Sequence, residues 1–170
     1  GGFWLASEGQ LPSEEEGDEG EAPIAIPGRP NELLRIDAAG AILERVGLPA
    51  ELVANATDSG FEGVAVSGSQ AAGDETLWVA IQREWADDPK GLVKIGRYDV
   101  AAAAWSFALY PLDPVESPNG GWVGLSEITL RPDGTLLIVE RDNQIALDAR
   151  IKRLYAVAPS AVEFAAHREQ

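Results

Sequence analysis

Short runs of apolar residues, separated by turn residues, occur along most of the 170-residue chain. Each run has the length and the β-branched or aromatic content that is typical of a strand. From residue 60 onward, runs of this kind occupy residues 60–67, 76–84, 92–99, 104–112, 124–132, 136–142 and 151–157. The Pro132-Asp133-Gly134 sequence between two of these runs is a specific hairpin signal. We therefore expect an all-β fold.

The order of these runs repeats along the chain. Four runs between residues 60 and 112 define one unit, and the runs from residue 124 onward repeat its order. The beginning of the chain fits the same unit without its first strand, through runs at 2–8, 31–37 and 41–48. Four-stranded units of about 40 to 60 residues are typical of β-propeller blades. The sequence thus predicts a β-propeller with about three four-stranded blades in this chain.

We expect this partial propeller to cover residues 1–158 and a C-terminal tail to follow at 159–170. Propellers have roughly four to eight blades, because fewer blades leave apolar blade faces exposed. N-terminal blades are therefore expected to be lacking, and another chain or self-association would complete the propeller. Residues 49–56 and 159–168 are candidates for short helices.

The charge of the chain limits its partners. With 13 basic and 28 acidic residues the formal net charge is -15, which disfavours nucleic acid and favours metal cations or basic partners. Part of this charge lies in an acidic segment, residues 13–23, which has no apolar periodicity. A solvated loop is the simplest interpretation of this segment. The alternative is a partner-binding surface built around Glu14 to Glu21.

Cysteine and methionine are both absent from the sequence. Disulfides, thiolate metal sites and cysteine nucleophiles are therefore excluded, whereas the cellular compartment stays open. No apolar run reaches the roughly 18 to 20 residues that a membrane-spanning helix needs, so we expect no membrane insertion. The chain opens without an initiator Met or a basic signal-peptide region, which suggests an interior or processed piece of a longer product.

Five glutamates occupy related places in the predicted strands. Glu62 and Glu127 lie early in first strands, and Glu8, Glu84 and Glu140 lie at the ends of second strands. Since antiparallel neighbours bring these ends together, we expect all five to meet at one mouth of the central channel.

Glutamates so close to one another repel unless a cation bridges them, and calcium accepts six to eight oxygen ligands without His or Cys. Asp142 and Asn143 add oxygen donors beside Glu140. The alternative is that each glutamate is a solvent-facing strand end paired with Arg or Lys.

Other chemistry in the sequence is limited. Arg83 and Arg141 flank two of the glutamates and fit either a salt bridge or the binding of phosphate oxygens. Trp85 and Trp122 lie beside the expected channel mouth and are candidates for stacking on a ligand, although strand packing explains most tryptophans. The single His167 lies near the C-terminus, and no nucleophile-elbow or P-loop motif occurs.

Three phrases of the sequence resemble the phytase-like propeller family, which is described by an esterase-like activity of phytase. They are GGFWLASEG at residues 1–9, GFEGVAVS at 60–67 and GLSEITLRPDGTLLIVERDNQIALDARIKRLYAV at 124–157. The opening segment of that family has no counterpart here, so the resemblance covers roughly the C-terminal half or more of such a domain. It implies a bacterial propeller in the periplasm or secreted, with calcium-dependent hydrolysis of phosphate esters or other esters. The positions that match its motifs are Glu8, Glu62, Glu84, Glu127, Glu140, Arg141 and Asp142.

The leading hypothesis is a calcium-dependent phosphoester or ester hydrolase that acts on a small-molecule ester. In this hypothesis the metal ligands are Glu8, Glu62, Glu84, Glu127 and Asp142. Glu140 would act as the general base, and Arg141 would stabilise charge on phosphate oxygens. The alternative is a non-catalytic propeller that binds a ligand or a protein and carries structural calcium.

Overall fold

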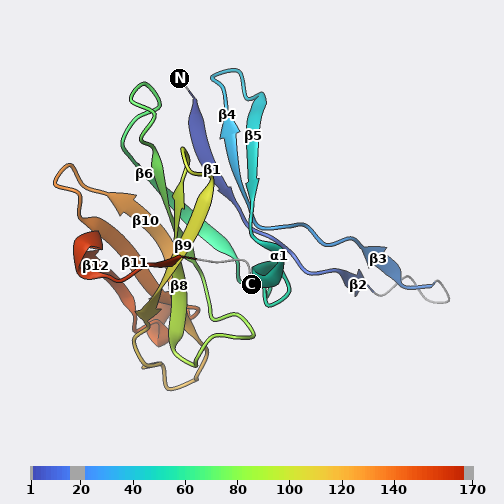
Figure 1. Ribbon diagram of the computed structural model, residues 1–170. Coiled ribbons are helices and arrows are strands. Elements are labelled where there is room, and N and C mark those ends of the chain that lie inside the picture. Colours follow the sequence, from blue (N-terminus) through green and yellow to red (C-terminus); the bar gives the residue numbers. More distant parts are fainter. Residues whose placement is uncertain (1, 16–21, 167–170) are drawn as a thin grey trace.

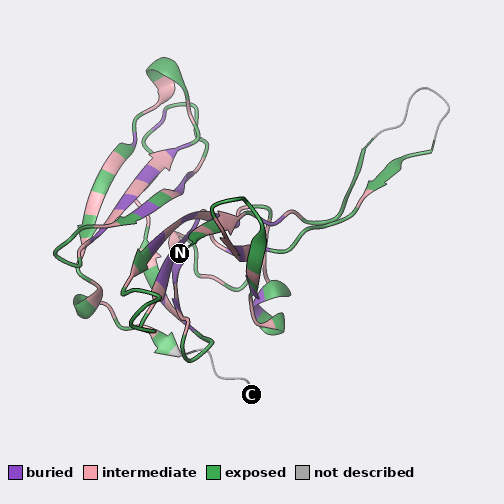
Figure 2. Cartoon of the chain, turned by 90° about the horizontal axis from the view of Figure 1, so that it is seen from above, coloured by how far each residue is buried: buried purple, intermediate pink, exposed green. Residues whose placement is uncertain are grey.

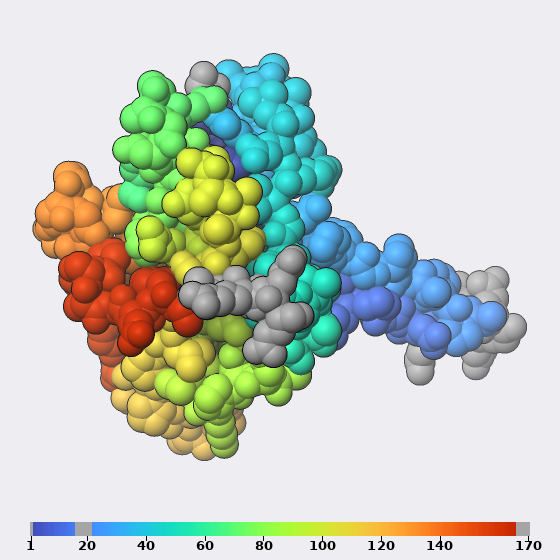
Figure 3. Space-filling view, viewed as in Figure 1, coloured from blue at the N-terminus to red at the C-terminus, as the bar shows by residue number. Residues whose placement is uncertain are grey.

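The fold of the chain was analysed in a computed structural model that describes residues 2–15 and 22–166 (Figure 1). It is all-β, and its strands form four antiparallel sheets. Three of the sheets pack on one another to form the body, and the fourth is a two-stranded arm that projects from it (Figures 1 and 3). Within the described residues, no helix has the length and apolar character needed to span a membrane.

Sheet 2 lies in the centre of the body. Its first four strands follow one another in sequence and in space: β6 (Phe61–Ser67), β7 (Thr76–Ile81), β8 (Leu92–Asp99) and β9 (Ala104–Pro111). This four-stranded antiparallel order is the one found in propeller blades. A fifth strand, β13 (Ala165–Ala166), arrives from the C-terminal segment and pairs with the outer edge of β9.

Sheets 1 and 3 cover the two faces of sheet 2 and have three strands each. Sheet 1 contains β1 (Phe3–Ser7), β4 (Glu32–Ile36) and β5 (Ile42–Gly47). Sheet 3 contains β10 (Val123–Leu130), β11 (Leu136–Asp142) and β12 (Lys152–Val157). Among the described residues, β1 forms an edge of sheet 1.

Two apolar clusters hold the three sheets together. Successive side chains of β7 belong alternately to one cluster and to the other. Leu77 and Val79 are fully buried against sheet 1, whereas Trp78 and Ala80 are buried against sheet 3. A strand with buried residues on both faces is continuously apolar, which explains the sequence TLWVAI. Figure 2 shows the same pattern, with buried residues in the strands of the body and exposed residues along the arm.

The strand registers show which residues of sheet 1 are equivalent to which residues of sheet 2. Trp4 pairs with Arg35 in sheet 1, and Trp78 pairs with Arg97 in sheet 2. In both pairs the guanidinium carbon lies 5.7 Å from the centroid of the tryptophan ring. β1 is therefore the counterpart of β7, as the sequence repeat predicted.

The remaining expectations had mixed outcomes. The helix expected at 49–56 exists only as the short α1 (Ala50–Val53). Of the helix expected at 159–168, only one 3₁₀ turn, η2 (Pro159–Ala161), is formed, so this prediction is wrong for the residues that the structure describes. Rather than ending as a free tail, the segment continues into β13 on sheet 2. The four-stranded blade pattern is complete only in sheet 2.

The acidic segment begins within the arm. Strand β2 (Ser13–Glu15) pairs with β3 (Ile24–Ile26), and all three residues of β2 are exposed. Residues 16–21, which carry most of the acidic side chains of this segment, lie outside the described part of the chain, as does His167. The beginning of the acidic segment is thus a strand rather than the loop that we expected.

Candidate functional site

Three equivalent strand ends meet beside the start of β6. Glu8 and Gln82 each follow their tryptophan, Trp4 or Trp78, by four residues, which makes their positions equivalent. Arg141 holds the same place near the end of β11, because β10 pairs with β11 as β6 pairs with β7. The three side chains are an acid, an amide and a base, and all three interact with the one carboxyl group of Glu62.

Glu62 is partly buried at the centre of this group. The side-chain amide of Gln82 donates a hydrogen bond to Glu62 Oε1. Burial raises the pKa of Glu62 above its ordinary 4.5, and the negative charges of Glu8 and Glu127 raise it further. The hydrogen bond from Gln82 and the positive charge of Arg141 lower the pKa but do not cancel the increase. Glu62 is thus a carboxyl group that gains and loses a proton closer to neutral pH than a free glutamate does.

Asn31 fixes the strands that carry Glu8 and Glu62. Its side-chain oxygen accepts hydrogen bonds from the backbone N–H of Gly9 and of Phe61, each at 2.9 Å. These two donors directly follow Glu8 and precede Glu62 in the sequence. Glu8 adds a further link, because its Oε1 accepts a hydrogen bond of 3.2 Å from the backbone N–H of Gly60.

Glu127 reaches the same region from β10, but it is not the counterpart of Glu62. A β-bulge lies between Phe61 and Gly63 in β6 and between Leu125 and Glu127 in β10, so Glu127 corresponds to Gly63. A Cβ atom at Gly63 would collide with the carboxylate of Glu127, which explains the glycine at that position. Glu127 is exposed and accepts a hydrogen bond of 2.8 Å from the backbone N–H of Ile128.

A pocket of about 350 Å³ has a lining that includes the basic residues Arg83 and Lys90, the acidic residues Glu84 and Asp113, and Trp122. Trp122 is a platform for two guanidinium groups: the Arg83 carbon lies 5.1 Å and the Arg141 carbon 5.3 Å from its ring centroid. Gly124 permits this packing, because a Cβ there would meet both Arg83 and Trp122. Trp122 thus links the pocket to Arg141, whose positive charge acts on Glu62.

Glu84 lies in this pocket rather than with Glu62. It forms a salt bridge of 2.9 Å with Arg83 and accepts a hydrogen bond of 2.8 Å from the backbone N–H of Gly91. Burial acts to raise its pKa, but the hydrogen bonds from its own backbone, from Gly91 and from Arg83 outweigh burial and lower the pKa below 4.5. Glu84 thus orients Arg83 and stays ionised.

Glu140 lies on the other side of its strand and faces sheet 2. It is fully buried, and its two oxygens accept hydrogen bonds of 3.0 Å from the Tyr110 hydroxyl and 2.6 Å from the backbone N–H of Asp113. Burial raises its pKa. It borders a separate pocket of about 440 Å³ between sheets 2 and 3, where Tyr155 and Arg153 both donate hydrogen bonds to Asp113.

The expectation that all five glutamates meet at one mouth is therefore wrong. The prediction failed because it assumed that Glu84 and Glu140 occupy equivalent positions. Glu140 pairs with Leu125 as Ile81 pairs with Phe61, so Ile81 is the counterpart of Glu140, and Glu84 lies three residues further on. Glu8 and Glu127 each interact with Glu62, whereas Glu84 and Glu140 have their own partners elsewhere.

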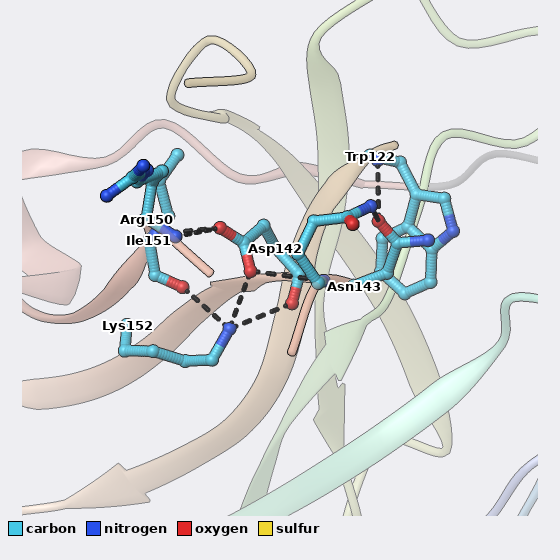
Figure 4. Close-up of polar contacts among 7 residues, drawn as sticks. Trp122, Asp142, Asn143, Arg150, Ile151 and Lys152 are labelled. Carbon is cyan, nitrogen blue, oxygen red and sulfur yellow. Dashed lines mark hydrogen bonds and ion pairs between the residues drawn. The ribbon is translucent and has the colours of Figure 1, made fainter. Parts of the chain in front are cut away.

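Asp142 is a structural carboxylate that organises the loop between β11 and β12 (Figure 4). Oδ2 accepts hydrogen bonds from the backbone N–H of Arg150 at 2.6 Å and of Ile151 at 2.8 Å, and Oδ1 lies 2.6 Å from Lys152 Nζ. Burial acts to raise its pKa, but the hydrogen bonds from Lys152 and the loop backbone outweigh burial and lower the pKa. The side-chain oxygen of Asn143 accepts a hydrogen bond from the backbone N–H of Trp122 (Figure 4). This bond positions the tryptophan that lines the pocket.

The metal ligands expected from the sequence can now be compared with this geometry. Among the described residues, no three His, Cys, Asp or Glu side chains are arranged so that they could hold a metal ion together. Glu84 and Asp142 are engaged with basic residues, and Glu127 is bound to its own strand. The carboxylates as arranged do not form a ready calcium site.

The comparison with protein families gives the last finding. The model of the phytase-like family, described as esterase-like activity of phytase, matches residues 1–169. The chain belongs to the phytase-like family. A search of curated proteins and a search of solved structures each found no match. The phytase-like family is propeller-like, in agreement with the three packed antiparallel sheets, and the resemblance seen in the sequence motifs is confirmed.

Sequence reasoning missed two residues of this phytase-like site, Gln82 and Asn31. Gln82 was overlooked because an amide replaces the charged residue of the other two repeats, although its place four residues after Trp78 marks it. Asn31 carries no local signal, since its two bonds join strands far apart in sequence. Of the two tryptophans considered for stacking, Trp85 is only 2% exposed and belongs to the core, whereas Trp122 lines the pocket.

Proposed function

We propose that the chain is an ester hydrolase of the phytase-like family in which Glu62 is the general base. The observation that carries this proposal is the interaction of Glu62 with Glu8, Gln82 and Arg141, with Arg141 packed on Trp122, which lines the pocket of Arg83 and Lys90. A carboxyl group with a raised pKa beside fixed cations is typical of a site that moves protons and binds anionic groups. The substrate we propose is a small phosphate ester.

In the proposed reaction, ionised Glu62 accepts a proton from a water molecule as that water attacks the phosphorus atom. The new bond joins the water oxygen to phosphorus, the bond between phosphorus and the ester oxygen breaks, and the leaving alcohol takes a proton from solvent. Arg141 and Arg83 stabilise the negative charge that develops on the phosphate oxygens. Trp122 holds both guanidinium groups in place, and Glu84 orients Arg83.

This role for Glu62 replaces the one that the sequence suggested for Glu140. A general base must reach the water from which it takes a proton. Glu140 is fully buried and holds Tyr110 and the backbone of Asp113. Glu62 is partly exposed and lies near enough to Arg141 for the positive charge of Arg141 to act on its pKa. Arg141 keeps the role of anion stabiliser that the sequence analysis gave it.

Calcium dependence is a separate proposal that needs its own test. Like-charge repulsion between Glu8 and Glu62 supports it, because a divalent cation would relieve that repulsion. These two carboxylates supply fewer oxygens than the six to eight that calcium accepts, so no step of the proposed reaction depends on the ion.

The test is hydrolysis of para-nitrophenyl phosphate and para-nitrophenyl acetate by four proteins: wild type, Glu62→Gln, Arg141→Met and the control Glu15→Gln. Glutamine keeps the carbonyl oxygen that accepts the bond from Gln82, so Glu62→Gln should fold normally. We expect it to lower kcat by about 10²- to 10⁴-fold, the range for loss of a general base, and Arg141→Met by about 10²-fold on the phosphate ester. Glu15 is exposed on the arm, and its variant should match wild type. Wild-type activity that Glu62→Gln leaves unchanged would refute the proposal.

A non-catalytic binding module is the second candidate, and the Trp122 platform favours it. An aromatic ring that packs against two guanidinium groups can hold them in place to bind an anionic ligand without any chemistry. Binding of inorganic phosphate that needs Arg83 and Arg141, without turnover of either ester, would support this candidate.

The proposal also includes the architecture and the compartment. We interpret sheets 1, 2 and 3 as three propeller blades, since they stack face to face and repeat the same registers. The resemblance to the family supports a periplasmic or secreted location in a bacterium, which fractionation of the producing cells would test.

A further inference from the structure

Sheet 1 leaves one face uncovered, and that face is apolar except for the salt bridge of Arg45, which pairs with Leu34, to Glu32. Register pairs place Phe3, Ile36 and Ile42 side by side on it, followed by Leu5 and Leu34. The exposed fractions are 61% for Phe3, 44% for Leu5 and 47% for Ile42. The opposite face of the same sheet packs on sheet 2 through Trp4, Ala6, Leu33 and Val46.

Sheet 3 also leaves one face uncovered, at the other end of the stack. The pairs Thr129 with Leu137, Leu137 with Ala156 and Val139 with Leu154 place these side chains together on it. The same registers place the charged residues Glu127, Arg141 and Lys152 at one end of this face. Leu154 is 61% exposed. The opposite face packs on sheet 2 through Leu136 and Ile138. The body of the molecule is thus a stack of three sheets that ends in an open apolar face on both sides.

The repeat shows what each open face is built to contact. In β7, Leu77 and Val79 point to sheet 1, and their counterparts in β1, Phe3 and Leu5, lie on the open face of sheet 1. Trp78 and Ala80 point to sheet 3, and their counterparts in β11, Leu137 and Val139, lie on the open face of sheet 3. The two open faces are therefore the two halves of an interface that already occurs twice in the chain.

We propose that a second copy of the chain covers both faces, with sheet 3 of each copy packed on sheet 1 of the other. The contact continues the stacking of sheet 1 on sheet 2 and of sheet 2 on sheet 3. Two copies bring six sheets together, which falls within the roughly four to eight blades of closed propellers. A two-fold axis then relates two equivalent contacts, and no apolar face stays open.

The first test is the mass in solution, measured by size-exclusion chromatography with light scattering over a range of concentrations. We expect twice the chain mass of 18.0 kDa, with dissociation on dilution. Leu5→Glu and Leu154→Glu each place a charge in both contacts and should raise the dissociation constant about 10-fold or more. Leu147→Glu is the matched control, because Leu147 is 87% exposed but lies in a 3₁₀ turn away from both faces. Circular dichroism of each variant monitors the fold.

A mixing experiment tests the head-to-tail arrangement itself. A pair formed from one Leu5→Glu copy and one Leu154→Glu copy has both substitutions in one contact and none in the other. The mixture should therefore associate more strongly than either variant alone. A monomer at every concentration would refute the proposal, and so would species larger than two copies. A dimer that Leu5→Glu abolishes and Leu154→Glu leaves intact would also refute it, because sheet 1 would then pack on sheet 1.

Discussion

Asn31→Ala gives the sharpest test of how the site is held together. The side chain is 6% exposed, and its oxygen accepts hydrogen bonds from the backbone N–H groups of Gly9 and Phe61, both at 2.9 Å. Alanine removes the acceptor of both bonds. Each donor that loses its acceptor costs about 1–3 kcal/mol, and water that enters the vacated space recovers part of this cost. We therefore expect a loss of about 2–4 kcal/mol in the free energy of unfolding.

The assay is urea unfolding followed by tryptophan fluorescence, with the free energy taken from linear extrapolation and the slope compared between variants. Asn119→Ala is the control, since Asn119 is exposed. A second variant probes the same atoms, because a Cβ at Gly60 would overlap the Asn31 side chain. Gly60→Ala should therefore destabilise the wild type and cost clearly less when Asn31 is already alanine. A loss below about 1 kcal/mol for Asn31→Ala, or full additivity of the two changes, would refute the reasoning.

Three further predictions concern pH, Tyr110 and calcium. The pKa of Glu62 is raised in the folded state, so its contribution to stability is complete below pH 4.5 and decreases as the pH rises through the folded pKa. Glu62→Gln should remove that part of the pH dependence of the melting temperature. In wild type, kcat/KM should decrease as the pH falls through a midpoint that lies above 4.5, because Glu62 must be ionised to act as the base. Tyr110→Phe removes one of the two hydrogen bonds to buried Glu140 and should lower stability by about 1–2 kcal/mol in urea unfolding, with esterase activity unchanged. If Glu8 and Glu62 share a calcium ion, calcium should raise the melting temperature of wild type and not of Glu62→Gln, and equal shifts in both would count against that site.

The strands were predictable because their signals are local. Alternation, turn residues and the recurrence of the same order placed every strand of sheets 1 and 3 and four of the five in sheet 2. The two-residue strand β13 was not predictable, because its pairing with β9 depends on contacts far away in sequence. The helix expected in the same segment has a good helical composition, which tertiary packing overrides.

The site was only partly predictable, because strand registers decide which residues are equivalent. Counting along the sequence aligned Glu127 with Glu62 and Glu140 with Glu84, but the registers make Glu127 the counterpart of Gly63 and Glu140 the counterpart of Ile81. A shift of one residue in a strand moves a side chain to the other face of the sheet. Glu140 therefore faces Tyr110, while its neighbour Arg141 faces Trp122. The chemistry of these residues was visible in the sequence, whereas the direction of each side chain was not.

The charges at the end of β11 illustrate the same distinction. Glu140 and Asp142 looked like ligands, because carboxylates rarely end an apolar strand without a reason. Both carboxylates have a structural role. Each accepts hydrogen bonds from backbone N–H groups of a loop, where regular secondary structure does not supply an acceptor. A carboxylate that holds a loop and one that holds a metal have the same sequence signal.

The C-terminal segment crosses from sheet 3 back to sheet 2, where β13 pairs with β9 and Phe164 packs edge-on against Trp78 at 5.5 Å. During synthesis the outer edge of β9 thus stays open while the ribosome makes all of β10, β11 and β12. The central sheet reaches its full width only afterwards, so the order of translation and the order of assembly differ in this chain. An unpaired edge that persists for this long is an opportunity for a chaperone or for aggregation.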